Sequence, residues 1–177
     1  METYIQAKEL VHHPDFFEQR QKTLSGLDLA AIDEPIIELI TRFGKLSYCF
    51  TLQCCYGHFL YADQTDAKNF KPLPDQSQDI DVDYRIAYLA VCVQNNEPGR
   101  ELLQDLRELT TIDPENIQFG SAQWFWDRQK NSYIVQVEPE RYKTQDRCVI
   151  DYREAKTVER VRNRFFDELE RIVGRRI

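Results

Sequence analysis

The sequence predicts a single α+β domain over residues 1–177, with a mixed β-sheet flanked by helices and a long amphipathic helix at its C-terminal end. A chain of 177 residues suits one domain. Segments rich in aromatic and β-branched residues alternate with segments whose apolar residues recur every three or four positions. Apolar residues make up 42% of the chain and charged residues 30%, which allows a buried core and excludes disordered and collagen-like proteins.

The first half of the chain contains two predicted helices and the start of the sheet. Apolar residues follow helical spacing over 16–24. A second helix is predicted over 33–43, because Asp33-Glu34-Pro35 supplies a capping acceptor, a first-turn carboxylate and an early proline. The stretch 46–61 is rich in aromatic and β-branched residues and predicts a strand, mainly over 47–56, that is interrupted near Gly57.

The second half continues the sheet and adds a helix. The Asp-rich stretch 62–84 is predicted to be a long loop, and 86–94 is a strand of the buried type. A capping asparagine precedes a predicted helix over 97–109. The segments 117–127 and 132–138 are predicted to pair as a hairpin.

The last predicted element is a helix over 150–174, with one apolar face that packs on the sheet. Its apolar residues recur at three and four: Ala155, Val158, Val161, Phe165, Leu169 and Ile172. The residues expected in the core of the whole domain are Leu89, Val91, Leu103, Leu106, Val135, Val137, Phe165 and Leu169.

Charge is distributed unevenly along this acidic chain. The net charge is -7, yet residues 141–177 hold eleven Lys+Arg against seven Asp+Glu, which leaves about -11 on residues 1–140. An acidic body repels phosphate backbones, so tight nucleic-acid binding is not expected. The arginines at one face of the last helix, Arg153, Arg160, Arg164 and Arg171, are interpreted as a solvated face or as an anion-binding stripe.

The cysteines and the N-terminal residues indicate a cytoplasmic protein that does not enter a membrane. Five cysteines form an odd set without a C-x-x-C pair, which favours reduced thiols over a disulfide framework. The first ten residues contain charged side chains and no hydrophobic signal region. The longest apolar run, Ile86–Val93, is far shorter than a membrane span.

The most unusual local sequence is the stretch Phe50–His58. On a strand, Cys54 and Cys55 point to opposite faces. Gly57 allows a bulge or the close approach of a ligand to the backbone, so a valine there is expected to block a ligand while the protein still folds. His58 is a candidate acid, base or ligand. The alternative is that the cysteines are small apolar residues and the histidine is a surface residue.

Metal and stacking sites are weaker hypotheses. A zinc site built from Cys55, His58 and Cys92, with His12 or His13 as fourth ligand, lacks the closely spaced ligand pairs of known zinc sites, so no metal is expected.

A second hypothesis concerns the aromatic run 124–126. If it is a strand, its two tryptophans share one face, as core residues or as a platform that stacks on a base.

Three stretches carry a resemblance to a known family. They are Phe17, Lys22 and Leu24, then Asp33, Ile36, Leu39 and Ile40, and then Phe50-Thr51 and Cys55-x-Gly57. In this order they resemble the opening of the tRNA wybutosine-synthesizing protein 3 family, where an Asp-led helix precedes a strand with the motif Thr-Thr-Ser-Ser-Cys-Ser-Gly-Arg. Residue identities cover 17–58, and the order of elements covers about 16–173. Tyr56 and His58 stand where the motif has serine and arginine.

The resemblance implies an α+β fold and S-adenosylmethionine-dependent methylation of a modified guanine base in tRNA. Three hypotheses follow. The first is a diverged relative of these methyltransferases that binds S-adenosylmethionine or another nucleotide-like small molecule at Thr51, Cys55, Gly57 and His58. The second is a non-catalytic binding or assembly module that recognises a protein partner or a second copy of itself. The third is a small thiol or metal enzyme centred on Cys55 and His58.

Overall fold

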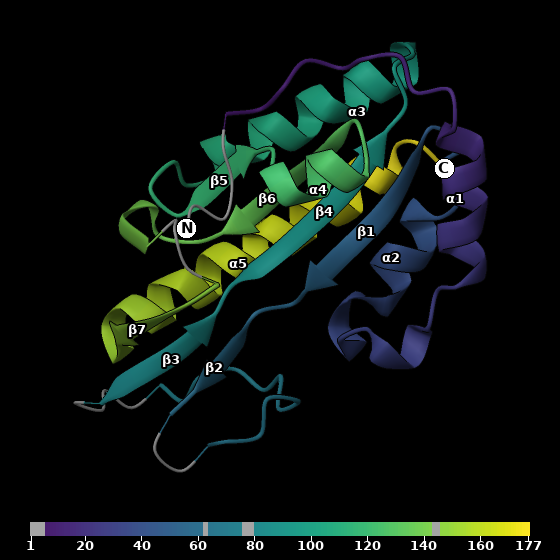
Figure 1. Cartoon of the computed structure of the whole chain (residues 1–177). Coiled ribbons are helices and arrows are strands. Elements are labelled where there is room, and N and C mark those ends of the chain that lie inside the picture. Colours follow the sequence, from purple (N-terminus) through teal and green to yellow (C-terminus); the bar gives the residue numbers. More distant parts are fainter. Residues whose placement is uncertain (1–5, 62–63, 76–79, 143–145) are drawn as a thin grey trace.

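The computed structural model describes residues 6–61, 64–75, 80–142 and 146–177, and it confirms the α+β class. Two sheets are present in this part of the chain. The four-stranded sheet has the order β1-β4-β6-β5, and the three-stranded sheet has the order β2-β3-β7 (Figure 1). The strands of the first sheet are β1 (Cys49–Cys55), β4 (Ala87–Val93), β5 (Ile117–Gly120) and β6 (Ser132–Val137). The strands of the second are β2 (His58–Leu60), β3 (Asp81–Arg85) and β7 (Arg147–Asp151).

The predicted single mixed sheet is wrong in strand direction, because every strand pair among the described residues is antiparallel. A parallel pair needs a long crossover between neighbouring strands. Here β1 pairs with β4 and β2 pairs with β3. The segment β1–β2 and the segment β3–β4 therefore form one antiparallel ribbon whose two ends lie in different sheets (Figure 1).

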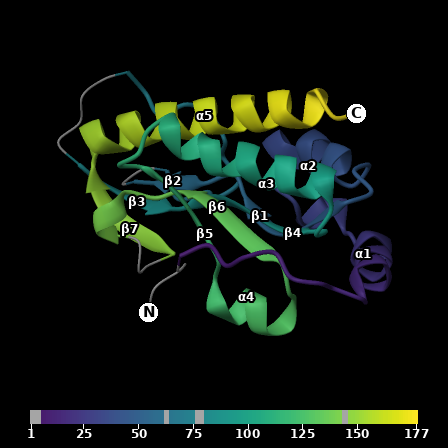
Figure 2. The ribbon, with the colours of Figure 1, turned by 90° about the horizontal axis from the view of Figure 1, so that it is seen from above.

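Helices cover both faces of the four-stranded sheet (Figure 2). The helices are α1 (Phe16–Ser25), α2 (Ile37–Phe43), α3 (Glu97–Glu108), α4 (Gln123–Arg128) and α5 (Tyr152–Gly174). Helices α2, α3 and α5 lie on one face and enclose the main core, while α4 lies on the other face. The long helix α5 contacts β3, β6 and β7, so it joins the two sheets. None of the described helices is both long enough and apolar enough to span a membrane.

The predicted core is confirmed with one shift along a helix. Leu103 is only half-buried, and its neighbour Leu102 is fully buried instead. The other predicted core residues are buried: Leu89, Val91, Leu106, Val135, Val137, Phe165 and Leu169. Ile36 and Ile40, at the start and middle of the second predicted helix, also face the core as expected.

The stretch 117–127 is not one strand. Strand β5 ends at Gly120, and 123–128 forms the short helix α4. Six residues are too few for periodicity to separate a helix from a strand. The helix forms because it packs Phe125 against Ala90 and Ile134 on the outer face of the sheet, and this leaves Trp124 46% exposed.

Two strands were missed because their sequences are rich in charge. The end of the predicted loop 62–84 is β3, in which Val82 and Tyr84 are buried and the intervening charged residues face outward. The same alternation marks β7, which pairs with β3. Residues 62–63 and 76–79 of the predicted loop lie outside the described residues.

The ribbon bends where it passes from one sheet to the other, at Gly57 on one strand and Ile86 on the other. Gly57 has a φ of 88°, and a Cβ placed on it lies 2.9 Å from the Cβ of Ala87. Gly57 therefore lies against β4. The sequence predicted that Gly57→Val blocks a ligand in a folded protein, and this reason is wrong, because the added side chain would overlap Ala87 of β4.

The opposite strand is held at the bend by the buried hydroxyl of Tyr84. This hydroxyl donates to the carbonyl of Val137 at 2.8 Å and accepts from the N–H of Ala87 at 3.0 Å. It thus links β3 of one sheet to β4 and β6 of the other. A buried backbone group without a partner costs free energy, so this hydroxyl stabilises the junction.

We expect Gly57→Ala to lower the free energy of unfolding by about 2 kcal/mol, because it combines a left-handed backbone with an overlap at Ala87. Urea denaturation measures the change. Gly26→Ala is the matched control: its φ is -95° and its nearest neighbour is 3.5 Å away, so a change within about 1 kcal/mol is expected. Equal effects of the two substitutions would contradict the bend assignment.

We expect Tyr84→Phe to lower the free energy of unfolding by about 2–4 kcal/mol, because it removes the hydroxyl partner of a buried N–H and of a buried C=O. Tyr133→Phe removes the hydroxyl of an equally buried ring, and this hydroxyl donates to the carbonyl of Lys8 at a part-buried position. A loss of about 1 kcal/mol is expected there. Urea denaturation of both variants tests the difference, and a smaller loss for Tyr84→Phe than for Tyr133→Phe would refute the role of the bridge.

Candidate functional site

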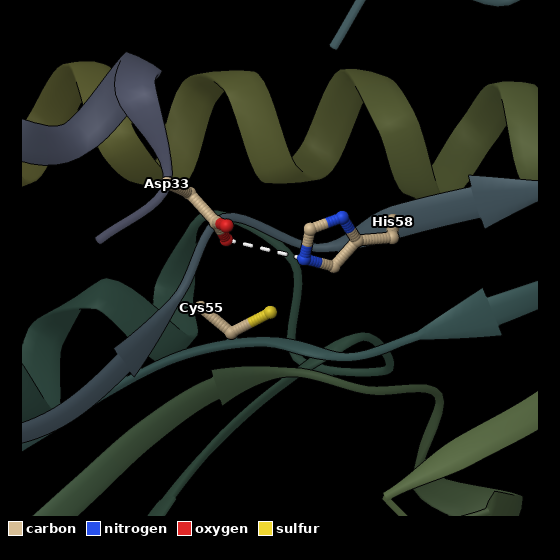
Figure 3. Close-up of side chains that lie close together, drawn as sticks. All are labelled: Asp33, Cys55 and His58. Carbon is tan, nitrogen blue, oxygen red and sulfur yellow. Dashed lines mark ion pairs between the residues drawn. The ribbon is translucent and has the colours of Figure 1, made fainter. Parts of the chain in front are cut away.

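Three side chains with different chemistry meet at the bend of the ribbon: Asp33, Cys55 and His58 (Figure 3). Cys55 is the last residue of β1 and His58 is the first residue of β2. Asp33 immediately precedes the 3₁₀ turn Glu34–Ile36 that leads into α2. A carboxylate oxygen, the thiol sulfur and a ring nitrogen all lie within 4.8 Å of one another.

Asp33 ties the start of α2 to the bend. Its Oδ2 accepts the backbone N–H of Tyr56 at 2.8 Å and lies 3.2 Å from Nε2 of His58. The sequence predicted this residue to be a helix cap, but its side chain makes no capping hydrogen bond. Its functional position was therefore missed. The sequence offered one indication of this position: Asp33 is among the residues, with Cys55 and Gly57, that carry the resemblance described above.

His58 is held as an imidazolium cation by its two hydrogen-bond partners. Its Nε2 faces the Asp33 carboxylate and its Nδ1 faces the backbone carbonyl of Ala67, so both ring nitrogens need a proton to donate. The hydrogen bond to Asp33 and the adjacent Cys55 raise the pKa of His58 to about 10, against the effect of burial.

The pKa of Asp33 moves in the opposite direction. Burial favours the neutral carboxyl, but the hydrogen bonds from His58 and from the N–H of Tyr56 outweigh it and lower the pKa. The carboxylate and the imidazolium thus stabilise each other as a charged pair in a largely buried position.

Helix α5 contacts the bend through Arg162, which is only 4% exposed. Its guanidinium donates to the carbonyl of Gly57 at 3.2 Å and lies over the ring of Tyr56 at 4.2 Å from the centroid. A second ring, Phe59, lies 5.1 Å away. These contacts bury a cation on aromatic faces and hold the residues on both sides of Gly57 in place.

The three side chains form part of the wall of a cavity of about 680 Å³. Trp124 and Phe125 of α4 also line it, with their rings stacked at 3.8 Å between centroids. Further polar groups reach the cavity from several strands and loops: Gln53, Arg85, Gln136 and Asp146. The cavity therefore combines an aromatic platform with opposite charges.

The structure brings two of the four predicted ligand-binding residues to this cavity. Cys55 and His58 line it. Gly57 shapes the bend between them but faces Ala87. Thr51 is buried in β1 opposite Val91, four residues from Cys55, next to an irregularity in the strand register. The role of all four residues in ligand binding stays a prediction.

The structure does not assemble the zinc set suggested by the cysteines and histidines. Cys92 lies opposite Phe50 in the sheet, whereas Cys55 lies opposite Tyr88, near the other end of the same strand. The amide nitrogen of Gln129 is 3.4 Å from the sulfur of Cys92 and 2.5 Å from Nε2 of His13. Those residues thus form a separate contact beside α4.

Comparison with known proteins supports the fold and adds no activity. No family model and no curated protein matches the sequence. The structure of the PH1069 protein from Pyrococcus horikoshii is similar, with a TM-score of 0.52 and 14% identity over 91% of this chain and 95% of that one. A structure of PH1069 from Pyrococcus horikoshii OT3 has a TM-score of 0.49 and 16% identity over 92% and 93%. At this identity, the first likeness shows the fold alone.

We expect the stabilisation that His58 provides to depend on pH. Its folded pKa of about 10 lies above the usual 6.5, so the contribution is complete below about pH 6.5 and is lost as the pH rises to 10. Asp33 has a lowered pKa, so its share is lost only in acid. His58→Gln should therefore reduce the free energy of unfolding by about 1–3 kcal/mol at pH 6 and by clearly less at pH 10.

Urea denaturation of both proteins from pH 5 to 10, with a chelator present, measures this difference. His12→Gln replaces an exposed histidine and serves as the control, with a difference near zero throughout. A His58→Gln effect that stays constant between pH 6 and pH 10 would disprove the imidazolium assignment.

Proposed function

We propose that the cavity at the bend binds a nucleoside-containing small molecule, with S-adenosylmethionine as the leading candidate, in a diverged relative of the tRNA wybutosine-synthesizing methyltransferases. The observation that carries the proposal is the arrangement of an aromatic pair on α4, of which Trp124 is exposed, and a charged wall at Asp33 and His58 around one cavity. The volume of about 680 Å³ suits a ligand of this size.

The chemistry of the wall favours a zwitterionic nucleoside over a polyphosphate. Asp33 and Asp146 offer carboxylates to ribose hydroxyls or to an ammonium group, whereas Arg85 and His58 offer positive charge to a carboxylate. These charges balance, so the cavity lacks the positive excess that a triphosphate requires. An adenine ring stacks on Trp124, a residue that is 46% exposed.

The same geometry supports a second candidate, a thiol enzyme, because Cys55 lies beside His58 and Asp33. In such enzymes the base that accepts the thiol proton is oriented by a third group. Here His58 already holds both ring protons through Asp33 and Ala67. His58 therefore lies beside the sulfur as a cation and is not a free base that could accept the thiol proton. We place this candidate second because it leaves the aromatic pair that lines the cavity without a role.

We further propose that the protein contacts nucleic acid only weakly, that a protein partner can bind at Trp124, and that the protein acts in the cytoplasm. An acidic body argues against tight tRNA binding, so we propose that any nucleic-acid contact is weak. The exposed Trp124 also suits a protein partner or a second copy of the chain, and a partner of this kind would compete with a nucleoside for the same ring. The described free cysteines fit a reducing compartment such as the cytoplasm.

We expect S-adenosylmethionine and its demethylated product to raise the thermal unfolding midpoint, and ATP to raise it less, because a ligand that binds only the folded state stabilises it. Trp124→Ala should weaken binding about 10-fold or more by removing the stacking surface. Calorimetric titration in the presence of a chelator gives the dissociation constants.

Phe17→Ala is the matched control, since Phe17 is an aromatic residue 60% exposed on α1 and does not line the cavity. It should bind as the parent protein does. Absence of any midpoint shift with millimolar nucleosides would reject the proposal. Equal weakening by both substitutions would reject the role of Trp124.

A further inference from the structure

The three side chains at the bend supply a donor set that differs from the set of cysteines and histidines considered from the sequence. Asp33 offers an oxygen, His58 a nitrogen and Cys55 a sulfur, all within 4.8 Å of one another. A tetrahedral ion with zinc–ligand bonds of about 2.0–2.3 Å holds its ligands roughly 3.3–3.6 Å apart. Oδ2 of Asp33 and Nε2 of His58 are already 3.2 Å apart, so a small movement of the Cys55 side chain completes the set.

Each of the three side chains is also held by a backbone group behind it. Nδ1 of His58 faces the carbonyl of Ala67, which turns Nε2 toward Asp33 and Cys55. The N–H of Tyr56 donates to Asp33 at 2.8 Å, and the N–H of Gly57 donates to the sulfur of Cys55 at 3.4 Å. Metal ligands in proteins are usually oriented by such outer hydrogen bonds.

Burial and access also fit a metal site with an open position. Cys55 and His58 are each 8% exposed, so the site is shielded from bulk water. All three side chains nevertheless line the cavity, which leaves room for a fourth ligand from the cavity side. Three protein ligands with one open position are characteristic of catalytic zinc sites.

We propose that Asp33, Cys55 and His58 bind one divalent ion of the zinc class in the wall of the cavity. A thiolate and an imidazole select zinc over magnesium or calcium, which prefer oxygen ligands. The carboxylate and the thiolate together neutralise the two charges of the ion. Both proposals share the wall at Asp33 and His58, but their tests are separate: nucleoside binding is measured with a chelator present and with Trp124→Ala, and metal binding is measured without a nucleoside.

The test uses the full chain, stripped of metal and titrated with Zn²⁺ or Co²⁺. We expect one ion per chain by mass spectrometry of bound metal, and a thiolate-to-cobalt absorption band with the visible bands of a tetrahedral cobalt complex. Cys55→Ser, His58→Gln and Asp33→Asn should each weaken binding at least about 100-fold.

The matched control is Cys54→Ser, which changes the neighbouring thiol in the same cavity and should keep one ion and the cobalt spectrum. A measurement on the parent protein needs no variant: Zn²⁺ should protect Cys55 from alkylation, as read by peptide mass spectrometry, and raise the unfolding midpoint. Failure to retain an ion at micromolar Zn²⁺, a cobalt spectrum without a thiolate band, or equal loss in Cys54→Ser would overturn the proposal.

Discussion

The chain crosses from one sheet to the other at Gly57, and both the packing of the sheets and the position of the candidate site follow from this crossing. A left-handed backbone and close contact with Ala87 allow the ribbon to leave the four-stranded sheet and enter the second sheet. The same turn places the last residue of β1 and the first residue of β2, Cys55 and His58, around one point in space. A residue with a side chain at this position would oppose both the fold and the site, so the architecture and the chemistry share one requirement.

The bend is rigid because three separate parts of the chain hold it. Asp33 binds the N–H of Tyr56 from the start of α2, and Arg162 binds the carbonyl of Gly57 from α5. On the other strand, the Tyr84 hydroxyl satisfies backbone groups at the point where the sheets separate. Site residues positioned by strands and by buried hydrogen bonds are better fixed than residues on a loop. This explains how a protein with such small sheets holds a charged pair at low exposure.

Local sequence predicted those parts of the fold whose signals are local. Capping residues and long apolar periodicity identified α2, α3 and α5, and buried apolar runs identified β1, β4 and β6. Helix α4 was missed because six residues with three consecutive aromatics fit either period. Strands β3 and β7 were missed because their outward faces are charged, and only their pairing with each other reveals them as a sheet.

The candidate site shows the same division between local and long-range information. Cys55, Gly57 and His58 are neighbours in sequence, so the unusual local stretch could point to them. Asp33 joins them across more than twenty residues, through a hydrogen bond that exists only when α2 packs beside the bend. Spacing rules for metal ligands rely on short sequence distances, so they argued against a zinc site and could not point to Asp33. The zinc set that the sequence did suggest included Cys92, which the sheet places opposite Phe50 instead.

Charge decides how the two proposals for this cavity relate. Without a metal ion, the Asp33 carboxylate and the His58 imidazolium form a pair with no net charge. With a divalent ion, the carboxylate and the thiolate offset its two charges and the histidine is neutral. The Asp33–His58 pair and the metal-bound set each carry no net charge, so we expect the preference of the cavity for a zwitterionic nucleoside to be the same with and without the ion. What would change is the wall at the bend, where a bound ion with an open coordination position would add an electrophile, whereas Trp124 is not one of the proposed ligands.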